Sequence, residues 1–125
     1  MTKCLADTNV LIRILKGNSE LSDWVDSLDC VVDTTVYVEL IQGAKDKKDV
    51  EKIEIALTAY ELIHFDQDIS RRTISLIQKY SKSHGLLLAD AMIAAVCLEK
   101  RLNLVTFNAK DFRFIDGLKL IVPKK

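Results

Sequence analysis

Residues 3–12 read KCLADTNVLI, and this stretch sets a pattern that the rest of the chain repeats. The short apolar run at residues 3–6 predicts a buried strand, Asp7 follows it, and residues 9–16 have the length and spacing of a helix. Four further runs predict strands at residues 30–32, 61–65, 104–107 and 118–122, and five segments predict helices at residues 20–28, 36–44, 50–60, 67–83 and 89–101. Strands separated by helices require crossover connections, so we expect a three-layer α/β/α sandwich around a mostly parallel sheet, with residues 1–125 as a single domain.

The composition supports one helix-rich domain. The chain has 125 residues, 49% of them hydrophobic, and only 4 glycines and 1 proline, which disfavours a turn-dense all-β fold. Its 18 basic and 18 acidic residues cancel, so no bulk positive field points to nucleic acid or a membrane surface. If the protein handles nucleic acid, a local site must show it.

The sequence also indicates the cellular compartment in which the protein is expected. No apolar run approaches the ~18 residues of a membrane helix, and Asp7 interrupts the amino terminus before a signal peptide could form. Cys4, Cys30 and Cys97 are odd in number and contain no CxxC pair, which disfavours disulfides and a thiolate zinc site. We therefore expect a cytoplasmic protein with no membrane partner and with buried thiols.

Polar residues at strand ends and helix starts are candidates for a site, because sites in open parallel sheets lie beyond the carboxyl ends of the strands. Asp7 ends the first predicted strand, where it can cap the next helix, form part of a site, or do both. Asp66 is predicted to cap the helix at residues 67–83, and Gly85 to end it. Glu39 is a lone acid in the apolar helical run VYVELI; solvent exposure is the simplest interpretation, although its apolar neighbours argue against it.

Asp90 is the most unusual of the candidate acids. It interrupts LLLADAMIAAV at residues 86–96, a helix that is apolar all round and is therefore predicted to be buried. It shares a face with Leu87, Ile93 and Ala94, none of which offers a cation. A buried, unpaired carboxylate is very costly, so we favour a site over a helix cap for Asp90.

The segment TFNAKDF at residues 106–112 follows a predicted strand and supplies Thr106, Asn108 and Asp111. Ion pairing with Lys110 or Arg113 is the simplest role for Asp111.

Together, the four acids Asp7, Glu39, Asp90 and Asp111 indicate a site more specifically than any one of them does, because the expected fold brings all of them to one edge of the sheet. Clustered carboxylates repel one another unless a cation lies among them. Oxygen ligands favour Mg²⁺ or Mn²⁺, and only two histidines are available for a zinc site. The chain has no GxxxxGK[ST] loop. Phosphodiester hydrolysis fits this site better than nucleoside triphosphate hydrolysis.

Four segments of the chain resemble the PIN-domain ribonucleases, and their order, spacing and total length are most similar to the toxins of VapBC-type toxin–antitoxin pairs. They are residues 7–12, 38–44, 89–95 and 104–112, and the similarity extends to residues 117–120. The resemblance implies a metal-dependent endoribonuclease that cuts RNA. It also implies a homodimer, held inactive by a small antitoxin protein that covers the active site.

By motif position, the resemblance assigns Asp7, Glu39 and Asp90 as the first three acids of the site. Many relatives carry an acid where this chain has Asn108, so Asp111 becomes the better candidate for the fourth position. We expect Asp7, Asp90 and Asp111 to bind one or two Mg²⁺ or Mn²⁺ ions, directly or through water. Glu39 would position the attacking water.

Three neutral side chains, Thr8, Thr106 and Asn108, are predicted to orient ligands or water. RNA must also be attracted locally, since the net charge is zero. The candidates for that attraction are Arg13, Lys16, Lys45, Lys47, Lys48, Lys110 and Arg113, each of which could equally be part of a solvated face.

Three other functions remain open from the sequence. A receiver-type phosphorylation domain would use Asp7, Asp66 as phosphoacceptor, Thr106 and Lys124, but it lacks an adjacent acidic pair and gives Glu39 and Asp90 no role. The second alternative is a PIN nuclease that acts in RNA processing and is not a toxin. The third is a non-catalytic binding module.

Overall fold

The computed structural model describes residues 3–124, which form five strands, six α-helices and one short 3₁₀-helix. In chain order the elements are β1 (Cys4–Ala6), α1 (Thr8–Leu15), α2 (Ser19–Asp26), β2 (Cys30–Asp33), α3 (Thr34–Gln42), α4 (Lys47–Leu57), β3 (Leu62–Ile63), α5 (Gln67–His84), α6 (Leu88–Lys100), β4 (Asn103–Val105), η1 (Ala109–Asp111) and β5 (Leu120–Ile121). Every predicted strand and helix is present, with ends that differ by up to three residues.

The five strands form one sheet in the order β3-β2-β1-β4-β5, and all four pairings are parallel. β1 is the central strand, with Leu5 opposite Val31 on one side and Leu104 on the other. The carboxyl ends of β1, β2 and β4 therefore meet at one edge of the sheet, as the sequence predicted.

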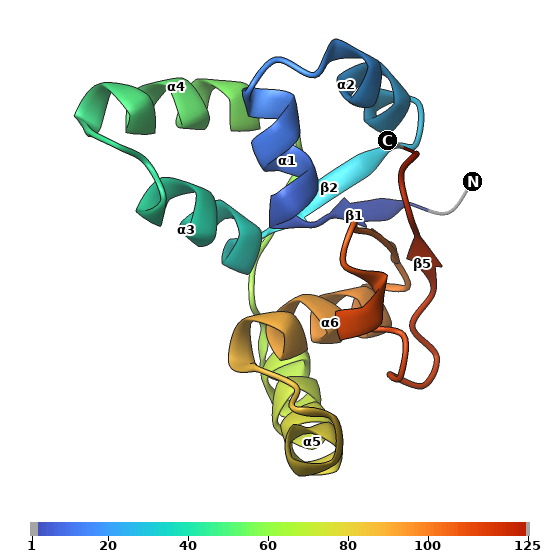
Figure 1. The fold of residues 1–125 in the computed structure, drawn as a ribbon. Helices are drawn as coiled ribbons and strands as arrows, with labels where there is room; N and C mark the ends of the chain where they lie inside the picture. Colours follow the sequence, from blue (N-terminus) through green and yellow to red (C-terminus); the bar gives the residue numbers. More distant parts are fainter. Residues whose placement is uncertain (1–2, 125) are drawn as a thin grey trace.

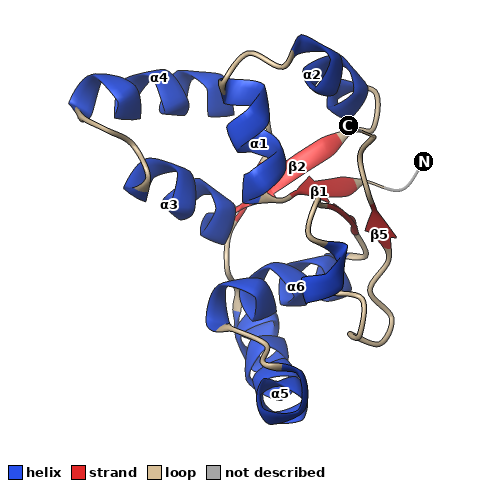
Figure 2. Ribbon diagram, in the orientation of Figure 1, coloured by secondary structure: helices blue, strands red, loops and turns tan. Residues whose placement is uncertain are grey.

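Helices cover both faces of the sheet (Figure 1). Side chains alternate along a strand, so the sheet can contribute residues to a core on each of its faces. Leu5 and Leu104 belong to the larger core, together with Ile93 of α6. Cys4 belongs to a smaller core, together with Val10 of α1 and residues of α2. Figure 2 shows α5 and α6 on the opposite side of the strands from α1 and α2, which confirms the three-layer sandwich.

Side-chain caps decide where the helices begin. Asp33 Oδ1 accepts the Val36 N–H at 2.8 Å, and α3 therefore starts two residues earlier than predicted. Asp46 caps α4 in the same way and adds a first turn that the apolar pattern missed. Gly85, at φ 70°, ends α5 as predicted.

The first turn of α6 corrects one prediction. Most of α6 is buried, but Leu87 and Leu88 are 71% and 63% exposed, and Asp90 is half-buried. This turn lies beyond the end of α5, at His84, so the packing that covers the rest of α6 does not cover it. None of the helices described, α6 included, is both long and apolar enough to cross a membrane.

None of the three cysteines forms a disulfide; Cys4 and Cys97 are buried, as predicted, whereas Cys30 is half-buried. Cys4 and Cys30 are far apart in the chain, but β1 and β2 place them opposite each other in register. Burial, with a smaller contribution from Cys4, raises the pKa of Cys30 to about 12. Burial also raises the pKa of Cys97 well above its usual value. Both thiols are therefore poor nucleophiles in the folded protein.

Candidate active site

Asp7 is at the centre of the candidate site and is only 5% exposed. It follows β1, and its own N–H donates to the Val105 carbonyl of β4. Its Oδ1 accepts the Thr8 N–H at 2.8 Å, so the residue caps α1. Its Oδ2 accepts from the Thr106 hydroxyl at 2.8 Å and from Asn9 Nδ2 at 3.3 Å. Asp7 is thus both a helix cap and a constrained carboxylate at the sheet edge.

Thr106 fixes the orientation of Asp7. Its side chain is fully buried, and its Oγ1 accepts the Asn108 N–H at 3.0 Å and Asn9 Nδ2 at 3.4 Å. A hydroxyl has one hydrogen to donate, and here that hydrogen is directed at Asp7 Oδ2. Thr106 therefore acts as a donor to Asp7, which favours the ionised carboxylate.

Opposing effects act on the charge of Asp7. Burial raises its pKa most strongly, hydrogen bonds from Thr106, Thr8 and Asn9 lower it, and the negative charge of Glu39 raises it further. The three hydrogen bonds occupy three of roughly four lone-pair positions on the carboxylate. One acceptor position is left for another ligand.

Glu39 lies on α3 and is half-buried rather than solvated. The Thr8 hydroxyl donates to Glu39 Oε1 at 2.7 Å, while the Thr8 N–H binds Asp7. A single residue at the start of α1 therefore holds two acids from separate elements.

Asp90 shares the electrostatic environment of these acids. Burial raises its pKa to about 6, and the charges of Asp7, Asp111 and Glu39 raise it as well. It caps no helix, because α6 has Leu87 as its N-cap and no side-chain cap bond. Among residues 3–124 no basic side chain forms an ion pair with Asp90. The acids that the sequence singled out thus influence one another in the fold.

The two candidates for the fourth position lie on the exposed loop after β4. Asp111 is exposed and forms no ion pair with Lys110, Arg113 or any other described residue. Asn108 is also exposed; its N–H binds Thr106, but its amide caps no helix. The charge of Asp111 acts on Asp90, which supports its place among the acids.

The donor set suits a hydrated divalent cation. Within the described residues, no three acidic, cysteine or histidine side chains are arranged to hold a metal ion. Mg²⁺, however, keeps several waters and usually takes only one or two carboxylates from the protein. Asp7 and Asp90 offer carboxylate oxygens, and both have raised pKa values that a nearby cation would lower. These residues therefore fit Mg²⁺ or Mn²⁺.

Two residues near the site were not among the predicted site residues. Asn9 binds Asp7 and Thr106 through its amide nitrogen and the Phe107 N–H through Oδ1, at 3.2 Å. The sequence could have indicated Asn9 as a site residue, because it belongs to the polar triplet at residues 7–9 that follows β1. It joins α1 to the loop after β4.

Asp33 is the second of these residues, and it is fully buried at the end of β2. Its Oδ1 caps α3, but Oδ2 has no hydrogen-bond partner, and neither does the buried hydroxyl of Thr35. Burial raises the pKa of Asp33 to about 6, the Val36 N–H and the neighbouring Thr35 side chain lower it, and the charges of Asp7 and Glu39 raise it. Its position at a strand end, like that of Asp7, was the available signal.

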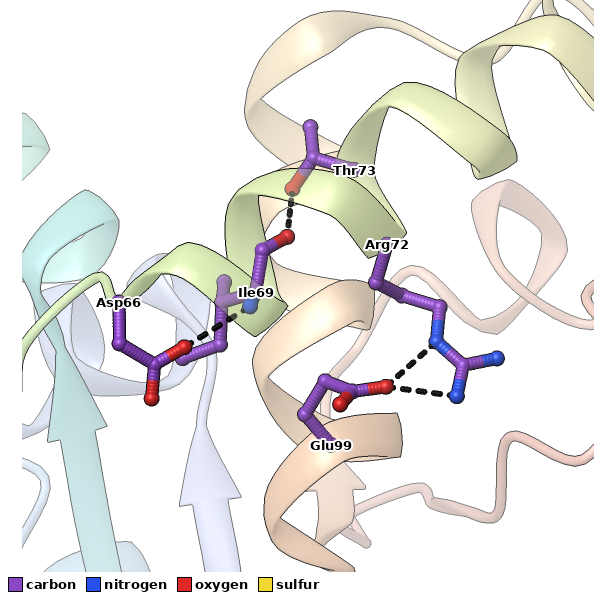
Figure 3. A network of polar contacts seen from close by, with 5 residues as sticks. All are labelled: Asp66, Ile69, Arg72, Thr73 and Glu99. Carbon is purple, nitrogen blue, oxygen red and sulfur yellow. Dashed lines mark hydrogen bonds and ion pairs between the residues drawn. The ribbon is translucent and has the colours of Figure 1, made fainter.

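Asp66 has a structural role. Its Oδ1 accepts the Ile69 N–H at 2.8 Å and caps α5, as predicted (Figure 3). Its Oδ2 pairs with Lys100 Nζ at 2.9 Å, and the two contacts lower its pKa. On the same helices, Arg72 binds one oxygen of Glu99 through Nε at 2.7 Å and Nη2 at 2.6 Å. Asp66 therefore stabilises the junction of α5 and α6, which leaves the phosphoacceptor interpretation without support.

Comparison with known proteins matches residues 4–118 to the PIN domain family. A curated relative from Methanocaldococcus jannaschii, named Ribonuclease VapC1, is 30% identical over 125 residues, which cover 95% of this chain and 87% of the relative.

Solved structures show the same fold. A chain of a toxin–antitoxin complex from Klebsiella pneumoniae is 31% identical, with a TM-score of 0.81 and 98% of both chains covered. A chain of VapBC2 from Rickettsia felis, solved with a DNA fragment from the promoter, is 22% identical, with a TM-score of 0.84. That superposition covers 98% of this chain and 99% of the other.

Proposed function

This chain belongs to the PIN domain family, and from that premise we propose that it is a Mg²⁺- or Mn²⁺-dependent endoribonuclease and the toxin of a VapBC-type toxin–antitoxin pair. The similarity to a named VapC ribonuclease and to a chain of a toxin–antitoxin complex supports the proposal. Both similarities extend over nearly the whole chain.

The observation that carries the proposal is the electrostatic coupling at the sheet edge. Asp90 feels the charges of Asp7, Asp111 and Glu39, and no basic side chain of the described chain is paired with it. Such a cluster repels itself at neutral pH unless a cation binds there. A purely structural role would not require these four acids in one neighbourhood.

We assign the ion to Asp7, Asp90 and Asp111, directly or through water. When bound, the ion supplies an activated water and offsets charge on the phosphate. Glu39, held by the Thr8 hydroxyl, orients the attacking water and accepts its proton. Thr106 keeps Asp7 ionised and aligned, and Asn108 braces the loop through its N–H.

RNA must approach a cluster of negative charge, so its phosphates need cations around the rim. We assign this role to local basic side chains, because the net charge of the chain is zero. The candidates are Arg13, Lys16, Lys45, Lys47, Lys48, Lys110 and Arg113, all of which are exposed.

We further propose a small antitoxin protein that covers the active site, a homodimer, and a cytoplasmic location. The toxin–antitoxin assemblies among the structural relatives support the first. The presence of thiols without a disulfide is consistent with a reducing compartment.

The direct test is RNA cleavage in Mg²⁺ by Asp7→Asn and Asp90→Asn proteins. We expect each to lose at least about 100-fold in rate, because loss of an outer partner of a metal ligand alone costs 10- to 100-fold. Asp23→Asn, at an exposed acid on α2, is the matched control and should retain full activity. Full activity in both site variants would refute the assignment.

A second experiment separates a toxin from a PIN nuclease of RNA processing. Expression of the wild-type chain should arrest growth, Asp90→Asn should not, and co-expression of a small protein encoded beside it should restore growth. RNA cleavage without toxicity would favour the processing nuclease.

A further inference from the structure

The guanidinium of an arginine lies over an aromatic ring beside the acidic site. The Cζ of Arg13, on α1, is 3.8 Å from the centroid of the Phe107 ring. This is well inside the ~6 Å limit of a cation–π contact. Phe107 is half-buried against the smaller core, whereas Arg13 is exposed. The ring therefore supports the guanidinium of an arginine that is otherwise exposed to solvent.

The pair is joined to the active site by Asn9. Asn9 Oδ1 accepts the Phe107 N–H at 3.2 Å, and Asn9 Nδ2 donates to Asp7 Oδ2 at 3.3 Å. Asn9 and Arg13 are four residues apart on α1, so they lie one turn apart on the same helix face, about 6 Å from each other. The guanidinium is thus about one helical turn from the residue that contacts Asp7.

Arg13 is not used to stabilise the fold. Its carbonyl accepts the Asn18 N–H, but its side chain makes no hydrogen bond or ion pair within residues 3–124, where it contacts the ring of Phe107. Its N–H donors and its outer face are available, whereas Arg72 is engaged by Glu99. A guanidinium is planar, and one that is supported by a ring and not engaged in an ion pair is a surface on which an unpaired nucleobase can stack.

We propose that Arg13 and Phe107 form a stacking platform for one unpaired base of the RNA, next to the phosphate that is cut. The inference rests on the proposed nuclease function and adds a substrate class to it. A base in a duplex is already stacked on both sides and cannot use the platform, so the substrate is single-stranded at this nucleotide.

The test is a double-mutant cycle between the protein and the RNA. Affinities are measured by fluorescence anisotropy, with Ca²⁺ in place of Mg²⁺, for a short single-stranded RNA and for the same RNA with abasic nucleotides. The proteins are wild type, Phe107→Leu, which keeps apolar volume but removes the ring, and Arg13→Gln. Arg71→Gln is the matched control, because Arg71 is an exposed arginine on α5.

For the RNA that carries bases, we expect Phe107→Leu and Arg13→Gln to weaken binding by about fivefold to a hundredfold, the range found for loss of one stacked base. For the abasic RNA, Phe107→Leu should bind as wild type does. Arg71→Gln should weaken both RNAs equally and slightly. Equal losses on both RNAs for Phe107→Leu and Arg13→Gln, or no loss, would overturn the platform and leave Arg13 as a phosphate contact at most.

The outcome is separable from that of the proposed function. Failure of the wild-type protein to cut RNA in Mg²⁺ would refute the nuclease, whatever the cycle gives. Cleavage without base-dependent loss in the two variants would refute the platform alone. An Arg13→Lys protein adds a direct check: it keeps the charge but not the plane, so it should retain the salt dependence of wild-type binding and lose the preference for RNA with bases.

Discussion

Replacement of Asp33 by asparagine should stabilise the protein at neutral and alkaline pH. Asp33 is fully buried, and one of its oxygens has no hydrogen-bond partner. Its folded-state pKa of about 6 lies above the ordinary value of 3.8, so the folded protein holds this proton more tightly than the unfolded chain does. Asparagine keeps a cap for α3, because Asn and Asp are equally good N-caps, and it removes the buried charge.

The sign and size follow from linkage. Below pH 3.8 the Asp33 carboxyl is protonated in the folded and the unfolded state, so it does not lower the free energy of unfolding. As the pH rises from 3.8 through about 6, the unfolded chain releases this proton more readily than the folded protein does, because burial disfavours the charged form. The free energy of unfolding therefore falls over this range. The full cost is about 3 kcal/mol, at 1.36 kcal/mol per pKa unit. The same arithmetic gives roughly 1.5 kcal/mol at pH 5 and about 3 kcal/mol at pH 8.

The assay is urea unfolding at pH 5 and pH 8, at one protein concentration and with EDTA present. Asp33→Asn should exceed wild type in the free energy of unfolding at both pH values, with the larger excess at pH 8. Asp46→Asn is the matched control, since Asp46 caps α4 with the same 2.8 Å bond but is exposed; its effect should stay below about 0.5 kcal/mol. A variant less stable than wild type at pH 8, or an excess that does not grow between the two pH values, would refute the reasoning.

Three further outcomes are expected. Thr106→Val should lower the free energy of unfolding by about 1–3 kcal/mol and the rate of RNA cleavage by about 10- to 100-fold, because Asp7 loses its buried hydrogen-bond donor. Thr106→Ser keeps the hydroxyl and should restore most of the stability and most of the rate. Urea unfolding and cleavage rates measure the two effects, and a fully active valine variant would contradict the prediction. Cys97, which is 1% exposed and whose pKa burial raises well above its usual value, should react with an aromatic disulfide reagent at pH 8 only as fast as the protein unfolds, and fast labelling of Cys97 in the native protein would disprove the burial argument. Gly85→Ala should lower the free energy of unfolding by about 1 kcal/mol, because the backbone at residue 85 has a left-handed φ of 70° that alanine disfavours. A Cβ at this position would meet no atom within 4 Å, so no steric clash adds to the effect. An unchanged midpoint in chemical denaturation would count against this explanation.

The fold was predictable because its signals are local. Strands such as Cys4–Ala6 are short and apolar, and the three that meet at the site, β1, β2 and β4, are each followed by an acid or a threonine that marks the edge of the sheet. The starts of α3 and α4 were missed by two and three residues, because Asp33 and Asp46 add a capped first turn that carries no apolar periodicity. Caps are hydrogen bonds of individual side chains, and a pattern of hydrophobicity does not report them.

The site was predictable only in part, for a related reason. The types and positions of Asp7, Glu39 and Asp90 identified them as candidates, because acids in apolar runs need an explanation. The contacts of Asn9 and the burial of Asp33 depend on which strands become neighbours, and that information is not local. The assignment of the fourth acid and of the ion remains a prediction that the mutational tests address.

The pairing of β4 with β1 has a consequence for synthesis. Thr106 donates its hydrogen to a residue 99 positions earlier, and Asp111 follows it. On the ribosome, the emerging chain carries Asp7 for most of translation without the strand and the hydroxyl that orient it. A fragment that ends before β4 lacks one neighbour of the central strand as well as both residues. We therefore expect an incomplete product of a stalled or degraded message to lack the assembled acidic site, so that only the finished chain carries it.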